Sequence, residues 1–139
     1  LRYVRMLGWH RKEYAGDLYK GGPAWCWEPE IWASRVPKPF WSGVMGAYGR
    51  DFLVVNSIHG NPWMGPGLHP CVKPEEVMIW LVSMFSPAGG IICDPFIGSG
   101  TTAVVAQKLG RRCIGVDLNE QYLKLAVKRL SSIPLPLPI

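Results

Sequence analysis

The sequence has no apolar run of the roughly 18 residues that a membrane-spanning helix needs, and no basic-then-apolar leader opens it. We therefore expect no membrane contact and interpret the chain as cytoplasmic.

Its four cysteines form no C-x-x-C pair, which argues against zinc, and no metal site is predicted. We expect reduced, buried thiols, since Cys93 and Cys113 lie inside apolar, strand-like runs.

Apolar residues are plentiful. They make up 48% of the 139 residues and include seven tryptophans, which is typical of one folded domain and argues against disorder. The net charge is +5, with 15 basic and 10 acidic residues. Such an excess fits a nucleic-acid partner, and it fits an ordinary soluble surface as well. The chain begins with Leu1 rather than methionine, so we expect a piece of a longer protein.

The composition changes near residue 68. Residues 1–68 hold six of the seven tryptophans among many glycines and prolines, and the runs at 30–34 and 51–55 predict short strands. Residues 69–131 predict a helix, a strand, a helix, a strand and a helix. This order implies an α/β fold with neighbouring parallel strands and a right-handed crossover. Residues 132–139 form a proline-rich tail that cannot continue the last helix.

The helix signals are local. Pro74 suits a first turn, and Glu75 and Glu76 suit the positive end of the helix dipole. The spacing of one buried face then gives Val77, Trp80, Leu81 and Met84. Asn119 predicts the N-cap of the last helix. Its buried face is predicted to hold Leu123, Ala126, Val127 and Leu130. Between these helices, residues 90–94 and 113–117 predict buried strands, and residues 101–109 predict a helix.

A glycine-rich turn joins the strand at 90–94 to the helix at 101–109. Gly98, Ser99 and Gly100 place free backbone N–H groups at the positive end of a helix dipole. Without Cβ atoms, the two glycines are expected to let a ligand approach the backbone. Asp117 ends the following strand, where a carboxylate can accept both hydroxyls of a ribose.

Three ligands compete for this turn. A nucleotide P-loop needs a lysine after the glycines, and Thr101 stands there instead. A nicotinamide dinucleotide fits the glycines, but its pyrophosphate would face Asp94 at the strand tip. S-adenosylmethionine has no phosphate. It offers a ribose to Asp117, a carboxylate to the helix amides, an ammonium to Asp94 and a sulfonium to an aromatic face such as Phe96. Charge favours S-adenosylmethionine over a nicotinamide cofactor, and a turn without any ligand is the remaining alternative.

Three motifs, HPCVKP (69–74), DPFIGSGTT (94–102) and GVDLNEQY (115–122), stand in an order similar to that of the β-class DNA amino-methyltransferases. Members of that family methylate the exocyclic amine of adenine or cytosine. The resemblance covers residues 69–130 closely and residues 1–68 loosely. It implies a Rossmann-like, S-adenosylmethionine-dependent methyltransferase fold that is incomplete at its N-terminus, and it implies double-stranded DNA as the partner of a modification methylase.

The resemblance also implies cofactor-binding residues. Asp117 matches the family's ribose-binding acid, and Leu118 would lie beside the adenine. The family's cofactor loop is matched by Asp94, Phe96, Gly98, Ser99, Gly100, Thr101 and Thr102. His69 and Lys73 match a segment that lies against the methionine end of the cofactor. For these last two, a hydrogen-bonded structural histidine and a surface lysine before a helix are the alternatives.

The family's catalytic motif, Asp/Asn/Ser-Pro-Pro-Tyr/Phe, is absent from the 139 residues, so no catalytic residue is predicted. Asn61-Pro62-Trp63 comes nearest but is better interpreted as a turn, and residues 37–40 match less well. We expect a truncated enzyme in preference to a chain completed by a partner or a homodimer. A non-catalytic cofactor-binding subunit or remnant is the main alternative, ahead of a nicotinamide-dependent oxidoreductase. The basic and aromatic residues between Arg35 and Arg50 either contact DNA or pack on a sheet.

Overall fold

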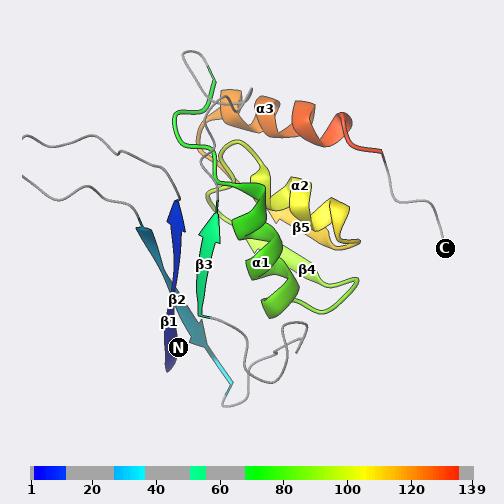
Figure 1. The fold of residues 1–139 in the computed structure, drawn as a ribbon. Helices are drawn as coiled ribbons and strands as arrows, with labels where there is room; N and C mark the ends of the chain where they lie inside the picture. The colour runs from blue at the N-terminus through cyan, green and yellow to red at the C-terminus, as the bar shows by residue number, and fades with distance from the viewer. Residues whose placement is uncertain (1, 12–26, 37–50, 56–67, 135–139) are drawn as a thin grey trace, which may run out of the picture. The chain divides into compact units, whose positions relative to one another are not determined.

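The computed structural model describes residues 2–11, 27–36, 51–55 and 68–134 (Figure 1). The chain divides into two compact units, Leu1–His59 and Gly60–Ile139, and each is described by itself. Several sequence predictions fall outside the described residues. They are those on Cys26, on residues 37–50, on the turn at 61–63 and on the end of the tail.

The first unit contains a three-stranded sheet with the order β2-β1-β3. The central strand β1 (Arg2–Arg11) runs antiparallel to β2 (Trp27–Ser34) and parallel to β3 (Phe52–Val55). The strands predicted at 30–34 and 51–55 are thus confirmed, whereas β1 was not predicted. Its signal was the period-two spacing of Leu7 and Trp9, which are 5% and 1% exposed.

The second unit has the predicted order of helix, strand, helix, strand and helix (Figure 1). The elements are α1 (Glu75–Phe85), β4 (Ile91–Asp94), α2 (Thr101–Lys108), β5 (Arg112–Gly115) and α3 (Glu120–Ser131). Strands β4 and β5 are parallel neighbours, as predicted, with Asp94 opposite Gly115. The predicted N-cap is confirmed too, because the Asn119 side chain accepts a hydrogen bond from the Gln121 amide. No helix in the described ranges is long and apolar enough to cross a bilayer.

The core of this unit lies where α2 contacts α1, α3 and β5. Helix α2 is buried almost throughout, and Val105 and Ala106 are fully enclosed. Helix α1 buries Val77, Trp80 and Met84 as predicted, while Val82 is buried and Leu81 is only half-buried. The helix spacing therefore located the buried face of α1 to within one residue.

Two burial predictions are wrong. Cys93 and Cys71 are exposed and Cys113 is half-buried. In β4, alternate side chains point to opposite faces, and Ile91 on the side of Cys93 is 55% exposed, so one face of this short sheet is open in the described part of the chain. The prediction of fully buried strands fails there for the same reason.

The second wrong prediction is the buried face of α3. Val127 is 61% exposed, whereas Leu125 and Arg129 are 9% and 3% exposed. The buried face follows the same helical spacing one residue earlier, through Tyr122, Leu125, Ala126 and Arg129. An arginine on this face hid it from a pattern based on apolar residues alone.

Candidate functional site

Two carboxylates lie at the same edge of the β4–β5 sheet. The Val116 amide donates to the Asp94 carbonyl at 2.9 Å, and the Ile97 amide donates to the Val116 carbonyl at 2.9 Å. These bonds hold the ends of both strands together, so Asp94 at the end of β4 and Asp117 just after β5 share one edge. The carboxyl ends of parallel strands are where open α/β sheets bind ligands.

Asp117 ties the glycine turn to the end of β5. One carboxylate oxygen accepts the Gly98 amide at 2.9 Å, and the other accepts the Asn119 amide at 2.8 Å. The Asn119 amide, followed by the Gly98 amide, lowers the pKa of Asp117 below its ordinary value. The group is therefore ionised at neutral pH. Each oxygen accepts one amide and can still take a further donor, such as a ligand hydroxyl.

The two glycines of the turn have left-handed backbones, with φ of +50° at Gly98 and +82° at Gly100. A Cβ on Gly98 would lie 2.7 Å from the His69 Nε2 atom, and a Cβ on Gly100 would lie 2.6 Å from the Ala126 Cβ atom. The space beside both glycines is thus filled by the protein itself. The structure gives them a packing role, where the sequence suggested room for a ligand.

The first turn of α2 presents backbone N–H groups before the first helical hydrogen bond. The Val104 amide is the first to bond back, to the Gly100 carbonyl at 2.9 Å. The amides of Thr101, Thr102 and Ala103 precede it, and no side chain caps the helix. These donors and the helix dipole favour an anionic group at this end of α2.

The hydroxyls of the turn point away from that opening. Ser99 and Thr101 are each 4% exposed, and Arg129 donates to both of their side-chain oxygens. The Thr102 hydroxyl faces the Met78 sulfur at 3.5 Å. If these residues touch a ligand, the contact is through their backbone.

Arg129 is the main residue that the sequence did not point to. It is buried, and burial lowers the pKa of its guanidinium, although the Glu75 carboxylate opposes that shift. Its only sequence signal is its place in the i, i+3, i+4, i+7 series of α3. That series is visible only once a charged residue is allowed on a buried face.

His69 has the contacts of a structural histidine. Its Nδ1 accepts the Cys71 amide at 3.1 Å, and its ring packs on Tyr122 with the centroids 4.5 Å apart. Its ring also fills the space beside Gly98, so it packs against the glycine turn. Lys73 is half-buried, and its Nζ lies 4.0 Å from the Cys71 sulfur. A contact of either side chain with a cofactor stays a prediction.

Phe96 and Leu118 stand in solvent beside the two acids, at 83% and 103% exposure. The Phe96 amide donates to Asp94 Oδ1 at 3.0 Å, so a local turn fixes the backbone that carries the ring. Two large apolar side chains kept in water at one edge form a surface that a flat or cationic ligand would cover favourably.

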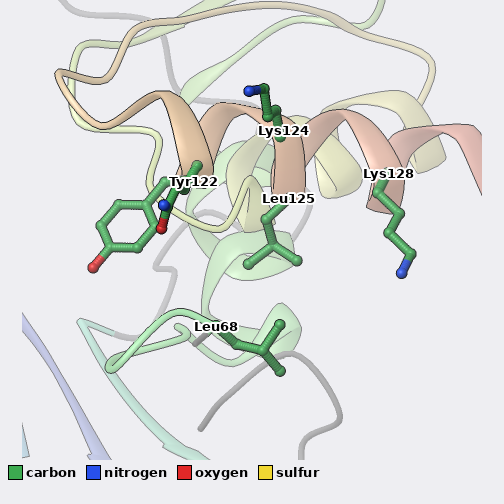
Figure 2. Close-up of a pocket in the computed structure, with 6 residues that line it drawn as sticks. Leu68, Tyr122, Lys124, Leu125 and Lys128 are labelled. Carbon is green, nitrogen blue, oxygen red and sulfur yellow. The ribbon is translucent and has the colours of Figure 1, made fainter. Parts of the chain in front are cut away.

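A separate pocket of about 230 Å³ lies along α3 (Figure 2). Its lining residues are Leu68, Gln121, Tyr122, Lys124, Leu125 and Lys128. Leu68 and Leu125 point toward one another, while Lys124 points away from them and pairs with Glu120 at 2.9 Å (Figure 2). None of the predicted cofactor residues lines this pocket. At the candidate site, Phe96 and Leu118 are solvent-exposed.

The described ranges contain no group of three or more histidine, cysteine, aspartate or glutamate residues placed to hold an ion. The groups that the structure brings to the candidate site are two carboxylates, the amides at the start of α2 and two exposed apolar side chains.

Residues 12–128, most of the chain, match the model of a family described as DNA methylase. The chain belongs to this DNA methylase family. The resemblance inferred from the three motifs is thus confirmed.

Two curated relatives of this chain are named as type II methyltransferases. M2.DpnII of Streptococcus pneumoniae is 50% identical over 66 residues, which cover 48% of this chain and 25% of the relative. M.SmaI of Serratia marcescens is 48% identical over 81 residues, which cover 58% of this chain and 27% of the relative. The matched part thus spans about a quarter of each curated relative.

Solved structures confirm the fold. The M1.HpyAVI–SAM complex matches with a TM-score of 0.74 at 24% identity, over 92% of this chain and 62% of that one. The cytosine-N4-specific PvuII DNA methyltransferase matches with a TM-score of 0.74 at 18% identity, over 93% and 52%. The chain therefore has the α/β fold of these methyltransferases, over part of their length.

Proposed function

We propose that this chain is the cofactor-binding part of an S-adenosylmethionine-dependent methyltransferase that modifies the exocyclic amine of adenine or cytosine in double-stranded DNA. The observation that carries the proposal is the Asp117 carboxylate, which accepts the Gly98 amide in the glycine turn that leads into the uncapped start of α2. The names of the relatives support it, because they include DNA methyltransferases and a complex with SAM.

The donors and acceptors of the site fit the cofactor group by group. Asp117 would accept the ribose hydroxyls, since each oxygen has capacity beyond its one backbone amide. The amides of Thr101 and Thr102, at the positive end of α2, would hold the carboxylate of the methionine moiety. Asp94 would face the ammonium group.

Apolar and basic side chains complete the proposed site. Leu118 would cover the adenine, and Phe96 would offer a ring face to the sulfonium. Gly98, Ser99 and Gly100 would shape the loop through their backbone. His69 and Lys73 would border the methionine end, with Lys73 able to pair with the carboxylate.

Charge separates this cofactor from a dinucleotide. Asp94 and Asp117 share one edge of the sheet, so a pyrophosphate placed there would face two carboxylates. S-adenosylmethionine, when bound, supplies an electrophilic methyl group and brings a cationic sulfonium to the same edge. The residues of this chain hold and orient it. The polar group and the stacked aromatic that would hold an extruded base are in a motif that the 139 residues lack.

That absence keeps the second candidate open, a cofactor-binding subunit or remnant that performs no transfer itself. We infer that any catalytic form gains the motif from further sequence or from a partner, and a homodimer stays a prediction. Because the proposed substrate is DNA, we also infer that the protein works in the cytoplasm.

Two measurements, made one after the other, test the proposal. Calorimetry should show that the 139-residue chain binds S-adenosylhomocysteine; an unfolded chain or a folded chain without binding would remove the proposed cofactor role. Tritiated S-adenosylmethionine and mixed-sequence duplex DNA should then yield no labelled DNA with this chain, and should yield labelled DNA with a version extended upstream of Leu1. An extended version with Asp117→Ala is the matched control and should lose activity. Label transferred by the short chain would contradict the assignment and make Asn61-Pro62-Trp63 a catalytic candidate.

A further inference from the structure

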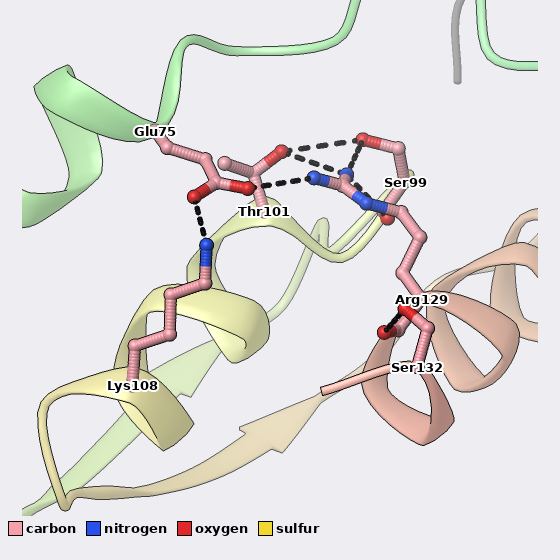
Figure 3. A network of polar contacts seen from close by, with 6 residues as sticks. All are labelled: Glu75, Ser99, Thr101, Lys108, Arg129 and Ser132. Carbon is pink, nitrogen blue, oxygen red and sulfur yellow. Dashed lines mark hydrogen bonds and ion pairs between the residues drawn. The ribbon is translucent and has the colours of Figure 1, made fainter. Parts of the chain in front are cut away.

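Arg129 is a charged side chain enclosed within the second unit. It is 3% exposed, and its guanidinium lies between the glycine turn and the start of α1 (Figure 3). Burying a cation is unfavourable unless partners replace the lost water. The polar partners of the guanidinium inside the protein are therefore what makes its burial possible.

The guanidinium binds the turn through three oxygens. Its Nη1 atom donates to the Ser99 carbonyl at 2.9 Å, to the Ser99 hydroxyl at 3.1 Å and to the Thr101 hydroxyl at 3.0 Å. Its Nη2 atom lies 3.7 Å from a Glu75 carboxylate oxygen, and the other oxygen of Glu75 binds Lys108 (Figure 3). One side chain thus joins the turn to Glu75 at the beginning of α1. Glu75 follows Lys73 by two residues in the sequence.

These bonds change what the first turn of α2 offers to a ligand. Serine and threonine hydroxyls at a helix start commonly accept the first free amides and cap the helix. The hydroxyls of Ser99 and Thr101 are engaged by Arg129 instead, and α2 has no side-chain cap. Since the N-cap residue is Gly100, which has no side chain, and the neighbouring hydroxyls bind the guanidinium, the amides at the start of α2 are left for an external acceptor.

The arrangement is costly for the folded state by itself. A cation near the N-terminus of a helix opposes the helix dipole, and an uncapped helix start lacks the stabilisation that a cap provides. Glu75 offsets part of the charge. Both unfavourable features become favourable when an anionic group sits on the amides, because it meets the dipole and the buried charge together.

We propose that Arg129 is a positioning residue for the carboxylate end of the cofactor. It holds the turn through Ser99 and Thr101 and adds positive potential beneath the uncapped amides of α2. The inference rests on the proposed function, since the ligand in question is S-adenosylmethionine. It assigns Arg129 no contact with the cofactor and no part in the transfer step.

The test compares two ligands that differ only at the end in question. S-adenosylhomocysteine carries the amino-acid end, and 5′-methylthioadenosine keeps the adenosine and the thioether without it. Arg129→Met removes the charge and the donors but keeps a long side chain. Binding should weaken by about tenfold or more for S-adenosylhomocysteine and by less than about twofold for 5′-methylthioadenosine. Arg129→Lys, which keeps the charge, should recover part of the loss.

Two further variants complete the design. Lys124→Met, on the exposed side of the same helix, is the matched control and should leave both affinities unchanged. Thr101→Val removes one acceptor of the guanidinium without emptying the core, so it should show the same selectivity even if Arg129→Met fails to fold. Circular dichroism must show each protein folded at the titration temperature.

The outcomes separate the inference from the proposed function. If Arg129→Met loses affinity for both ligands equally, the arginine has a general structural role and the inference is overturned. Unchanged binding of S-adenosylhomocysteine in folded Arg129→Met or Thr101→Val would overturn it as well. If the unmutated protein binds neither ligand, the proposed function fails and the inference fails with it.

Discussion

Gly100 offers the sharpest test of how the glycine turn is built. An added Cβ would lie 2.6 Å from the Ala126 Cβ atom and 2.9 Å from its Cα atom, and the backbone φ is +82°. A left-handed alanine costs about 1–2 kcal/mol, and overpacking costs about 1–3 kcal/mol more. Gly100→Ala should therefore lower the free energy of unfolding by about 2–5 kcal/mol, a large part of the stability of a small domain.

Gly110→Ala is the matched control. Gly110 also has a left-handed backbone, with φ of +68°, but nothing lies within 4 Å of an added Cβ. Gly110→Ala should lower the free energy of unfolding only by the cost of a left-handed alanine, about 1–2 kcal/mol. In the Gly100→Ala background, Ala126→Gly should recover part of the loss, although alone it costs about 1 kcal/mol through helix propensity.

Urea unfolding followed by circular dichroism measures the difference. With a slope of about 2 kcal/mol per molar, Gly100→Ala should move the midpoint down by about 1–2.5 M and Gly110→Ala by about 0.5–1 M. Equal midpoints for the two variants, or no recovery with Ala126→Gly, would refute the packing role and return Gly100 to the role of ligand approach.

Asp117→Ala should weaken S-adenosylhomocysteine binding by about tenfold to a hundredfold in calorimetry, because the acceptors proposed for the ribose are lost; unchanged affinity removes Asp117 from the site. The folded pKa of Asp117 lies below its ordinary value of 3.8, so the stability it contributes should be complete above that value and lost as pH falls through the folded pKa. Urea midpoints of Asp117→Asn should show a weaker acid dependence than those of the unmutated chain. Iodoacetamide should label Cys93 faster than Cys113, since Cys93 is exposed whereas burial, followed by the nearby Asp94, raises the pKa of Cys113; mass spectrometry showing equal rates would contradict this.

Local signals predicted the second unit well. The acids after Pro74 and the Asn119 cap act within a single turn of chain, so their effect does not depend on distant residues. The parallel pairing of β4 with β5 also followed from the order of elements, because a helix between two short strands leaves few other connections.

Burial was predicted less well. The prediction that Cys93 is enclosed assumed that both faces of its strand are covered, and the strand pattern contains no information on what covers the second face. Val127 was assigned to the core of α3 because it is apolar, whereas the structure exposes it and buries Arg129 on the face one residue earlier. Whether a charged residue can be buried depends on partners that are remote in sequence, here Ser99, Thr101 and Glu75.

The sequence by itself determined the family of this chain and the features on which the proposed ligand rests: an acid at the end of each of two strand segments, a glycine turn without a lysine, and three motifs in the order of that family. These features are short segments whose chemistry is set by residue type and spacing. Only the tertiary structure decided that His69 and Ala126 fill the space beside the glycines and that Arg129 holds the hydroxyls of the turn. Those contacts join residues about 30 positions apart, so they form only when packing brings α3 and the segment that carries His69 against the turn.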